Sequence, residues 1–271
     1  MSFFFVAALG VALHWATYLN KLRVLIPQTR DRQTEILPCS PSDVPGLDLE
    51  KLEAATCELQ VLGFQFLEDH ASRPVKAAPE NTPPIADPMA AVAPVEPFKP
   101  QGMARVFVHR ELGCLAKVLG ITVIKTATNS IATTSFSVAI VSLSGSGENP
   151  LSYSTSNRVA DATNDALMML TRRPQSLSTR VPGASIEAVF KIHLERRDDL
   201  ARAAGIGWNK SITLADDYLS EKLSSENIRR VYGALNPFSM AWKIFISKRK
   251  PLPVRLEWLG DFAGQIPTVQ R

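Results

Sequence analysis

The chain has 271 residues, of which 45% are apolar and 21% charged. This composition excludes a wholly disordered chain, because the apolar side chains suffice for the core of one large domain or two small ones. The three cysteines are odd in number and widely spaced, which argues against a disulfide framework and a four-ligand zinc site. We therefore expect reduced thiols, no metal and no cofactor.

The chain begins with an apolar segment, MSFFFVAALGVALHWATYLNKLR. A helix over residues 2–19 would be roughly 27 Å long, slightly shorter than the ~30 Å hydrocarbon core of a bilayer. Lys21 and Arg23 can supply the missing length by snorkelling, and Trp15 and Tyr18 stand where an interfacial aromatic belt is expected. The segment is thus predicted to be a transmembrane helix.

The charges on either side of this segment predict its orientation. No Lys or Arg precedes the apolar run, whereas Lys21, Arg23, Arg30 and Arg32 follow it. The positive-inside rule then places the remainder of the chain in the cytoplasm, and the missing basic n-region argues against a cleaved export signal. We expect a retained single-pass anchor over 1–22 in the cell membrane, with a cleaved signal and a buried soluble helix as alternatives.

After a proline-punctuated connection over 23–47, the sequence LDLEKLEAATCELQVLG predicts a helix that Asp48 caps and Gly63 ends. FQFLED follows as a short strand. Residues 74–101 are rich in proline and alanine, so no strand or long helix is expected there. We interpret this stretch as an insert within one cytoplasmic α+β domain over 48–271.

The next part of the chain predicts an antiparallel sheet. Strand-like runs over 106–108 and 114–119 flank a turn at 110–113, and Phe136, Val138 and Ile140 alternate with small or polar residues. The loop 144–150 then reverses the chain into a further strand. Because no ten-residue helix separates these runs, we expect four to five mostly antiparallel strands.

The remaining segments are predicted to be helical. DATNDALMMLTRR is a short helix stopped by Pro174, and residues 186–204 form an amphipathic helix that ends at Gly205. TLADDYLSEKL and SENIRRVYG indicate two more short helices. The fold class is therefore α+β, with the helices over 49–62 and 186–204 covering the sheet.

Two histidines are weak catalytic candidates. HRELGC brings His109 near Glu111 and Cys114, but no second histidine is near enough to complete a metal site. His193, in KIHLERRDD, lies on the apolar stripe of its helix without an evident nucleophile. The glycines of SLSGSGENP lie between two strands with no following lysine, which indicates a hairpin loop rather than a phosphate-binding loop.

The tail AWKIFISKRK combines an apolar aromatic run with basic residues. The aromatic run could dip into a lipid interface while the charges meet anionic head groups, and the residues concerned are Trp242, Lys243, Lys248, Arg249 and Lys250. The alternative is a last core element with a basic surface. Nucleic-acid binding is not expected, because the basic residues are scattered and form no recognised motif.

Three segments, LQVLGFQFLED, VFVHRELGCLAKV and LSYSTSNR, resemble in this order a group of bacterial single-pass membrane proteins of unknown function. The resemblance implies a membrane-anchored α+β domain without an assigned activity, and the insert at 74–101 departs from it. We therefore expect a binding or scaffolding role at the membrane surface, with membrane lipid and another protein as partners. The alternative is a membrane-tethered enzyme, such as a hydrolase, with a cleft between sheet and helices.

Overall fold

The structure is a computed structural model that describes residues 19–20, 32–76, 100–125, 130–144, 150–159, 167–168, 170–234, 236–248 and 255–256. The chain divides into two compact units. We call residues 34–159, 174–221 and 254–271 the sheet unit, and residues 1–33, 160–173 and 222–253 the helical unit.

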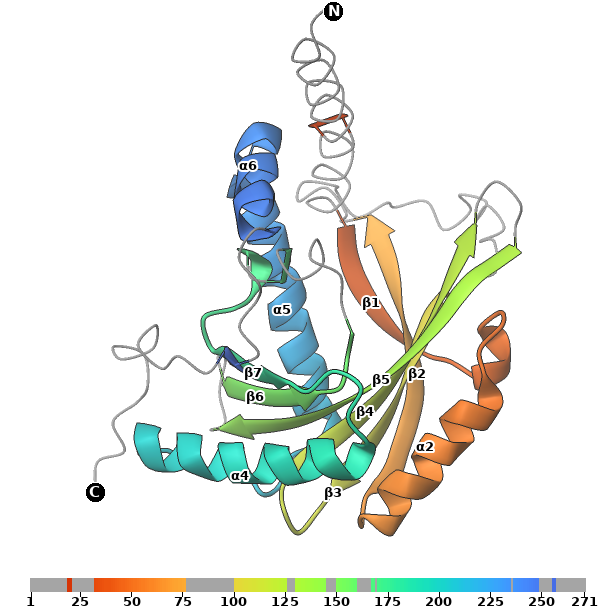
Figure 1. The fold of residues 1–271 in the computed structure, drawn as a ribbon, viewed down its shortest axis with the longest axis vertical. Coiled ribbons are helices and arrows are strands. Elements are labelled where there is room, and N and C mark those ends of the chain that lie inside the picture. The colour runs from red at the N-terminus through yellow and green to blue at the C-terminus, as the bar shows by residue number, and fades with distance from the viewer. Residues whose placement is uncertain are drawn as a thin grey trace, which may run out of the picture. The chain divides into compact units, whose positions relative to one another are not determined.

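A mostly antiparallel sheet forms the sheet unit (Figure 1). Within the described residues it has eight strands, which follow one another across the sheet in chain order. Every pairing from β2 to β8 is antiparallel except that between β6 and β7, which is parallel. The strands are β1 (Arg32–Pro38), β2 (Gln65–Lys76), β3 (Gly102–His109), β4 (Cys114–Lys125), β5 (Ser130–Ser144), β6 (Leu151–Ser156), β7 (Ser176–Arg180) and β8 (Arg255–Leu256).

The sheet confirms the α+β class and the mostly antiparallel pairing, but the predicted number of strands is wrong. The short strand expected at FQFLED is the twelve-residue β2, which continues through Pro74 into the predicted insert. The sequence SLSTR forms β7 beside β6, although it carries only one large apolar residue, Leu177. Such strands form because a neighbouring strand supplies their hydrogen bonds, which local propensity does not report.

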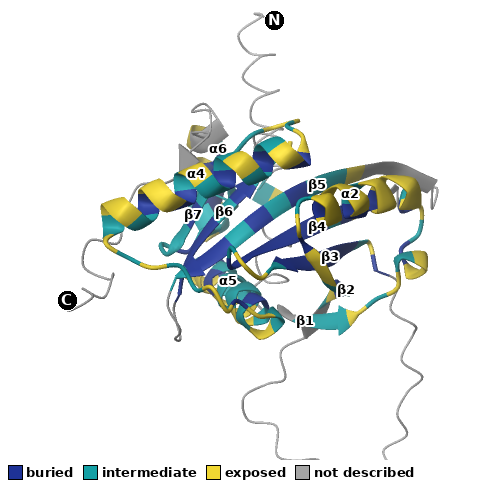
Figure 2. Ribbon diagram, turned by 90° about the horizontal axis from the view of Figure 1, so that it is seen from below, coloured by how far each residue is buried: buried dark blue, intermediate teal, exposed yellow. Residues whose placement is uncertain are grey.

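Two helices pack on one face of the sheet, here called the α2/α4 face (Figure 2). α2 (Leu49–Val61) begins at Asp48, whose side chain accepts a hydrogen bond from the Lys51 amide, and Gly63 follows it at φ +90°. α4 (Ile186–Ala204) begins at Ser185 and ends at Gly205, which is left-handed at φ +65°. Both helices thus confirm the sequence prediction, and each uses a capping residue to satisfy free backbone groups.

The core of this face consists of strand residues that alternate with those of the opposite face. Phe107, Cys114, Ala116 and Val118 are buried against α2 and α4, as is Ile140 of β5. This alternation follows from the two-residue repeat of a strand, which turns successive side chains to opposite faces. Among the side chains that the helices cover are Val138 and Ile140, whose alternation with small or polar residues was evident in the sequence.

The opposite face packs against the start of α5 and is here called the α5 face. Val106, Val108, Leu115 and Leu143 form its apolar cluster together with Ile212, just before that helix. α5 (Leu214–Ala234) is one continuous helix of 21 residues, so the prediction of two short helices in this region is wrong. Ser224 and Ser225, near the middle of α5, interrupt the apolar periodicity of the sequence, but the helix continues through them.

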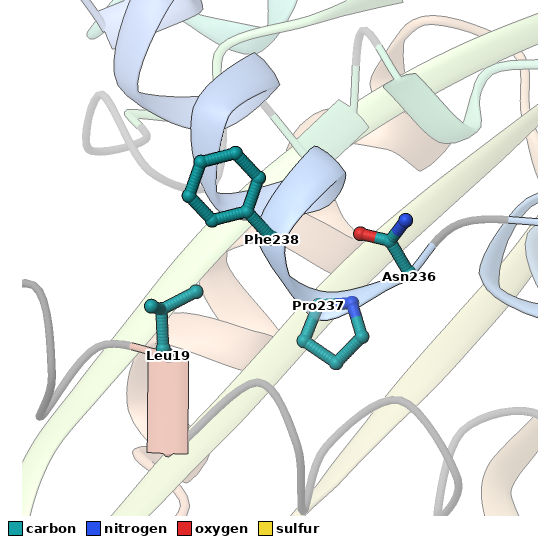
Figure 3. Close-up of a pocket in the computed structure, with 4 residues that line it drawn as sticks. All are labelled: Leu19, Asn236, Pro237 and Phe238. Atoms are coloured by element: carbon teal, nitrogen blue, oxygen red, sulfur yellow. The ribbon is translucent and has the colours of Figure 1, made fainter.

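In the helical unit, α6 (Pro237–Lys248) packs against the end of α5. Met240, Ala241 and Ile244 are buried with Tyr232 in one apolar cluster. Figure 3 shows Leu19, Asn236, Pro237 and Phe238 lining a cavity of about 390 Å³ at the start of α6. Of the helices in the described ranges, none has the length and apolarity that crossing a bilayer requires. The predicted anchor over 1–22 lies outside the described residues except for residues 19–20.

Candidate functional site

His109, the first catalytic candidate, lies in an aromatic environment rather than among polar groups. Its ring stacks on Phe190 at 5.8 Å between centroids and meets the edge of Phe64 at 5.2 Å. Its Nδ1 atom is buried without a hydrogen-bond partner. The ring also lies over Gly63, where a Cβ would come within 3.0 Å of the His109 Nε2 atom. These contacts assign His109 a packing role.

Cys114 pairs with His109 across the hairpin between β3 and β4, as the sequence prediction of a turn at 110–113 requires. The Cys114 side chain is fully buried, and burial raises the pKa of its thiol to about 12 despite the opposing effect of Arg197. A thiol with that pKa is protonated at neutral pH and is therefore a poor nucleophile and a poor metal ligand. His109 and Cys114 are thus neighbours without the chemistry of a Cys–His site.

His193, the second candidate, joins a chain of buried hydrogen bonds. Its Nε2 atom is 2.9 Å from the hydroxyl of Ser142, and its Nδ1 atom is 3.2 Å from that of Thr155. Thr155 in turn donates to the hydroxyl of Tyr153, which lies 2.9 Å from Thr179. The Tyr153 and His193 rings stack at 5.1 Å. The network therefore ties α4 to β5, β6 and β7.

The donor and acceptor roles in this series of hydrogen bonds fix the tautomer of His193. Because the Thr155 hydroxyl donates to Tyr153, it accepts from His193 Nδ1–H, and the Ser142 hydroxyl donates to Nε2. A serine that donates to a histidine is the arrangement of an activated nucleophile. Here, however, both Ser142 and His193 have 0% exposure, so substrate cannot reach either group. Burial and the charge of Arg197 also lower the pKa of His193 to about 3.

The third predicted site, in the tail, lies on α6 and presents a second apolar stripe. Phe238, Trp242 and Ile246 recur at four-residue spacing and are 64%, 50% and 41% exposed, and Trp242 stacks on Phe245. Lys243 is exposed beside them. The opposite side of the same helix is buried in the helical unit. α6 is therefore apolar on two sides, and the exposed apolar side is typical of a contact surface.

The remaining predicted contact residues are only partly described. Lys248 is the last residue of α6, and only its backbone is described. Arg249 and Lys250 lie outside the described residues, as do the four residues predicted at the anchor and its interface, Trp15, Tyr18, Lys21 and Arg23.

Basic residues are concentrated in the helical unit. Between 167–173 and 222–248 the only acidic residue is Glu226. The same two ranges carry seven basic residues, which are Arg172, Arg173, Lys222, Arg229, Arg230, Lys243 and Lys248. The excess of one sign of charge in the unit that bears the exposed stripe of α6 favours an anionic partner.

A buried charged cluster on the α5 face was not predicted from the sequence. Lys117 of β4 is 8% exposed, and its Nζ atom lies 2.6 Å from an oxygen of Asp217 and also contacts Glu221. Burial lowers the pKa of Lys117, but the two carboxylates outweigh it and the net shift is upward. His70 of β2 lies 3.9 Å from Glu221. One turn of α5 thus supplies both carboxylates, four residues apart.

The sequence held one signal for this cluster. On β4, Lys117 shares a face with Leu115 and Leu119, so a charge falls on an otherwise apolar strand face. A lysine in that position needs a buried anionic partner. The sequence could not name the partner, because Asp217 and Glu221 lie about one hundred residues further along the chain.

A second ionic cluster, on the α2/α4 face, is structural. The Arg105 guanidinium donates two hydrogen bonds to Asp69, at 2.8 and 2.9 Å, and one each to Glu53 and Thr56 of α2. Its cation also lies 5.6 Å from the centroid of the Phe66 ring. The acceptors of these four hydrogen bonds lie on β2 and α2, so Arg105 fastens α2 to β2 and β3.

Comparison with known proteins supplies no further assignment. No protein family, no curated protein and no solved structure matches the chain.

Proposed function

We propose that the chain is a binding or scaffolding module that works at the membrane surface, with α6 in contact with an anionic lipid surface. The second apolar stripe of α6, formed by Phe238, Trp242 and Ile246, carries the proposal. An aromatic and aliphatic stripe beside lysines suits the boundary between head groups and acyl chains, because the rings enter the apolar layer while the ammonium groups stay in water.

Charge supports the same partner. The described part of the helical unit carries eight basic residues, Arg32 included, and one acidic residue. The basic residues other than the buried Arg173 favour a surface rich in negative head groups. Each Lys or Arg near such a surface contributes about 1 kcal/mol of attraction, within a Debye length of it. An apolar protein partner would use the stripe but would gain nothing from this charge.

The alternative of a membrane-tethered hydrolase has less support. The Ser142–His193 pair has suitable geometry but lies entirely inside the protein. His109 and Cys114 are occupied by packing. The burial and packing of these four residues support the binding role over the hydrolase.

The contact is tested with an environment-sensitive fluorophore placed on α6. Ile246→Cys is labelled in the full chain, with the exposed Cys57 and the half-buried Cys39 both changed to serine. The protein is reconstituted into neutral phosphatidylcholine vesicles or into vesicles with about one third phosphatidylglycerol. We expect a blue shift and quenching by brominated lipid in the anionic vesicles only. Raising the salt concentration should reverse both changes.

Val61→Cys provides the matched control, since Val61 is 87% exposed and lies on α2 of the sheet unit. Its spectrum should be the same in both kinds of vesicle. A second variant, Lys243→Glu, should weaken the contact by roughly tenfold, because it reverses a charge beside the stripe. A fluorophore at 246 that reports water in anionic vesicles would refute the proposal, and equal burial in neutral vesicles would refute the role of charge.

A further inference from the structure

Arg173, in the helical unit, is a buried charge without a partner. The residue is 5% exposed, and none of its three guanidinium nitrogens has a hydrogen-bond partner among the described residues. Burial lowers the pKa of the guanidinium, and no carboxylate in the described part of the chain offsets that shift. Because an arginine nevertheless stays charged at neutral pH, a full positive charge and five N–H donors are enclosed without an acceptor.

The two other buried arginines of the described chain show how such a charge is ordinarily accommodated. Arg105 donates two hydrogen bonds to Asp69, and Arg197 donates to the Leu112 carbonyl oxygen at 2.6 Å. Arg173 has neither kind of acceptor within the described residues. Since burying an unpaired charge is strongly destabilising, the surroundings of Arg173 are complete only when an anion is present.

The neighbourhood of Arg173 adds positive charge. Arg173 follows a helical turn that packs on α5 and α6, and the side-chain amide of Asn227 donates to the Thr171 carbonyl oxygen at 2.7 Å. The Oδ1 atom of Asn227 accepts from Arg230, also at 2.7 Å, which holds a second guanidinium one side chain away from this turn. Arg172 directly precedes Arg173 in the chain. This concentration of cations suits an ion with several negative oxygens better than a single carboxylate.

We propose that Arg173 anchors a buried binding site for a phosphate group, carried either by a free phosphate or by a lipid head group. The planar guanidinium matches two oxygens of a phosphate, and the exposed Arg230 can add a contact from the solvent side. Arg173 lies in irregular backbone after the helical turn, so its side chain can turn toward an incoming ion without breaking a helix. The inference goes beyond the contact of α6 with lipid and does not require it.

Thermal unfolding of the full chain in neutral detergent micelles tests the site. Inorganic phosphate is titrated against sodium chloride of equal ionic strength, and a second series mixes phosphatidylglycerol into the micelles. We expect a saturable rise in the unfolding midpoint, of roughly 3 °C at about ten times the apparent dissociation constant. A rise with inorganic phosphate indicates a free phosphate as the ligand, whereas a rise with phosphatidylglycerol alone indicates a head group.

Arg173→Met should abolish the rise with inorganic phosphate and reduce the rise with phosphatidylglycerol. It should also raise the midpoint of the phosphate-free protein, because methionine removes the unpaired charge. Arg173→Lys keeps the charge but loses the planar fork, so it should fold like the wild type and weaken the apparent affinity roughly tenfold.

Lys222→Met is the matched control, because it removes an exposed cation of the same unit and should leave the response unchanged. Lys243→Glu, which weakens the α6 contact, should likewise leave the part of the rise that depends on Arg173, so the two proposals can fail separately. No rise in either series, or a rise that Arg173→Met and Arg173→Lys retain in full, would overturn the site. An equal rise with acetate would overturn the choice of a phosphate group.

Discussion

Replacing Lys117 by methionine tests whether the ion pairs on the α5 face stabilise the sheet unit. Methionine keeps most of the length of the side chain but removes the ammonium group that contacts Asp217 and Glu221. The Asp217 side chain is 3% exposed and cannot be rehydrated without moving α5. Breaking a buried pair from one side costs about 3–5 kcal/mol, and we expect the lower end because Glu221 is 30% exposed.

The pH dependence of this effect has a definite sign. The net pKa of Lys117 is raised in the folded protein, so the stability that it contributes is fully present at neutral pH. That contribution is lost only as the pH rises through the folded-state pKa of the lysine. The difference between wild type and Lys117→Met should therefore persist at neutral pH and shrink in strongly alkaline solution.

The assay is denaturant unfolding of the full chain in mild detergent, followed by far-UV circular dichroism. The double variant Lys117→Met with Asp217→Leu removes both charges and should recover about 2 kcal/mol of the single-variant loss, because an apolar pair can replace a buried ion pair. Arg202→Met, which removes a 77% exposed cation, should leave the midpoint unchanged. Additive costs for Lys117 and Asp217, or a negligible cost for Lys117→Met, would refute the reasoning.

Three further predictions concern buried groups elsewhere in the sheet unit. The lowered pKa of His193 means that stability falls as the pH drops below the ordinary imidazole range, by ~3 kcal/mol near pH 4, and His193→Gln should flatten this part of a pH series of unfolding curves. Gly113→Ala should lower the free energy of unfolding by about 2–3 kcal/mol, because the alanine Cβ would lie 2.5 Å from the Asn209 carbonyl oxygen and the backbone at this position has φ +61°. An unchanged unfolding midpoint would contradict this packing. A maleimide should label the exposed Cys57 within minutes but Cys114 only in denaturant, as measured by mass spectrometry. Fast labelling of Cys114 in the folded protein would contradict the burial of its thiol.

Local patterns predicted the elements whose signals lie within a few residues. The helix from Ile186 to Ala204 was predicted from its apolar stripe and from the Gly205 stop, which acts on adjacent backbone groups, and the structure adds the cap at Ser185. The hairpin between β3 and β4 was predicted for the same reason, since its turn needs a left-handed residue at Gly113. Even the inward placement of His193 followed from the helical repeat alone.

The composition of the candidate sites required the tertiary structure. His193 meets Ser142 across 51 positions of sequence and Lys117 meets Glu221 across 104. Neither partner is specified by its neighbours in the chain, because strand register and the return of α5 onto the sheet bring them together. The tail was predicted only as an apolar aromatic run beside basic residues. The packing of Met240 and Ile244 showed which side of α6 is buried, and it left Phe238, Trp242 and Ile246 as a second, exposed side. Sequence therefore determined the local elements of this protein, whereas burial and pairing between distant segments decided which of its polar and aromatic residues are available for binding.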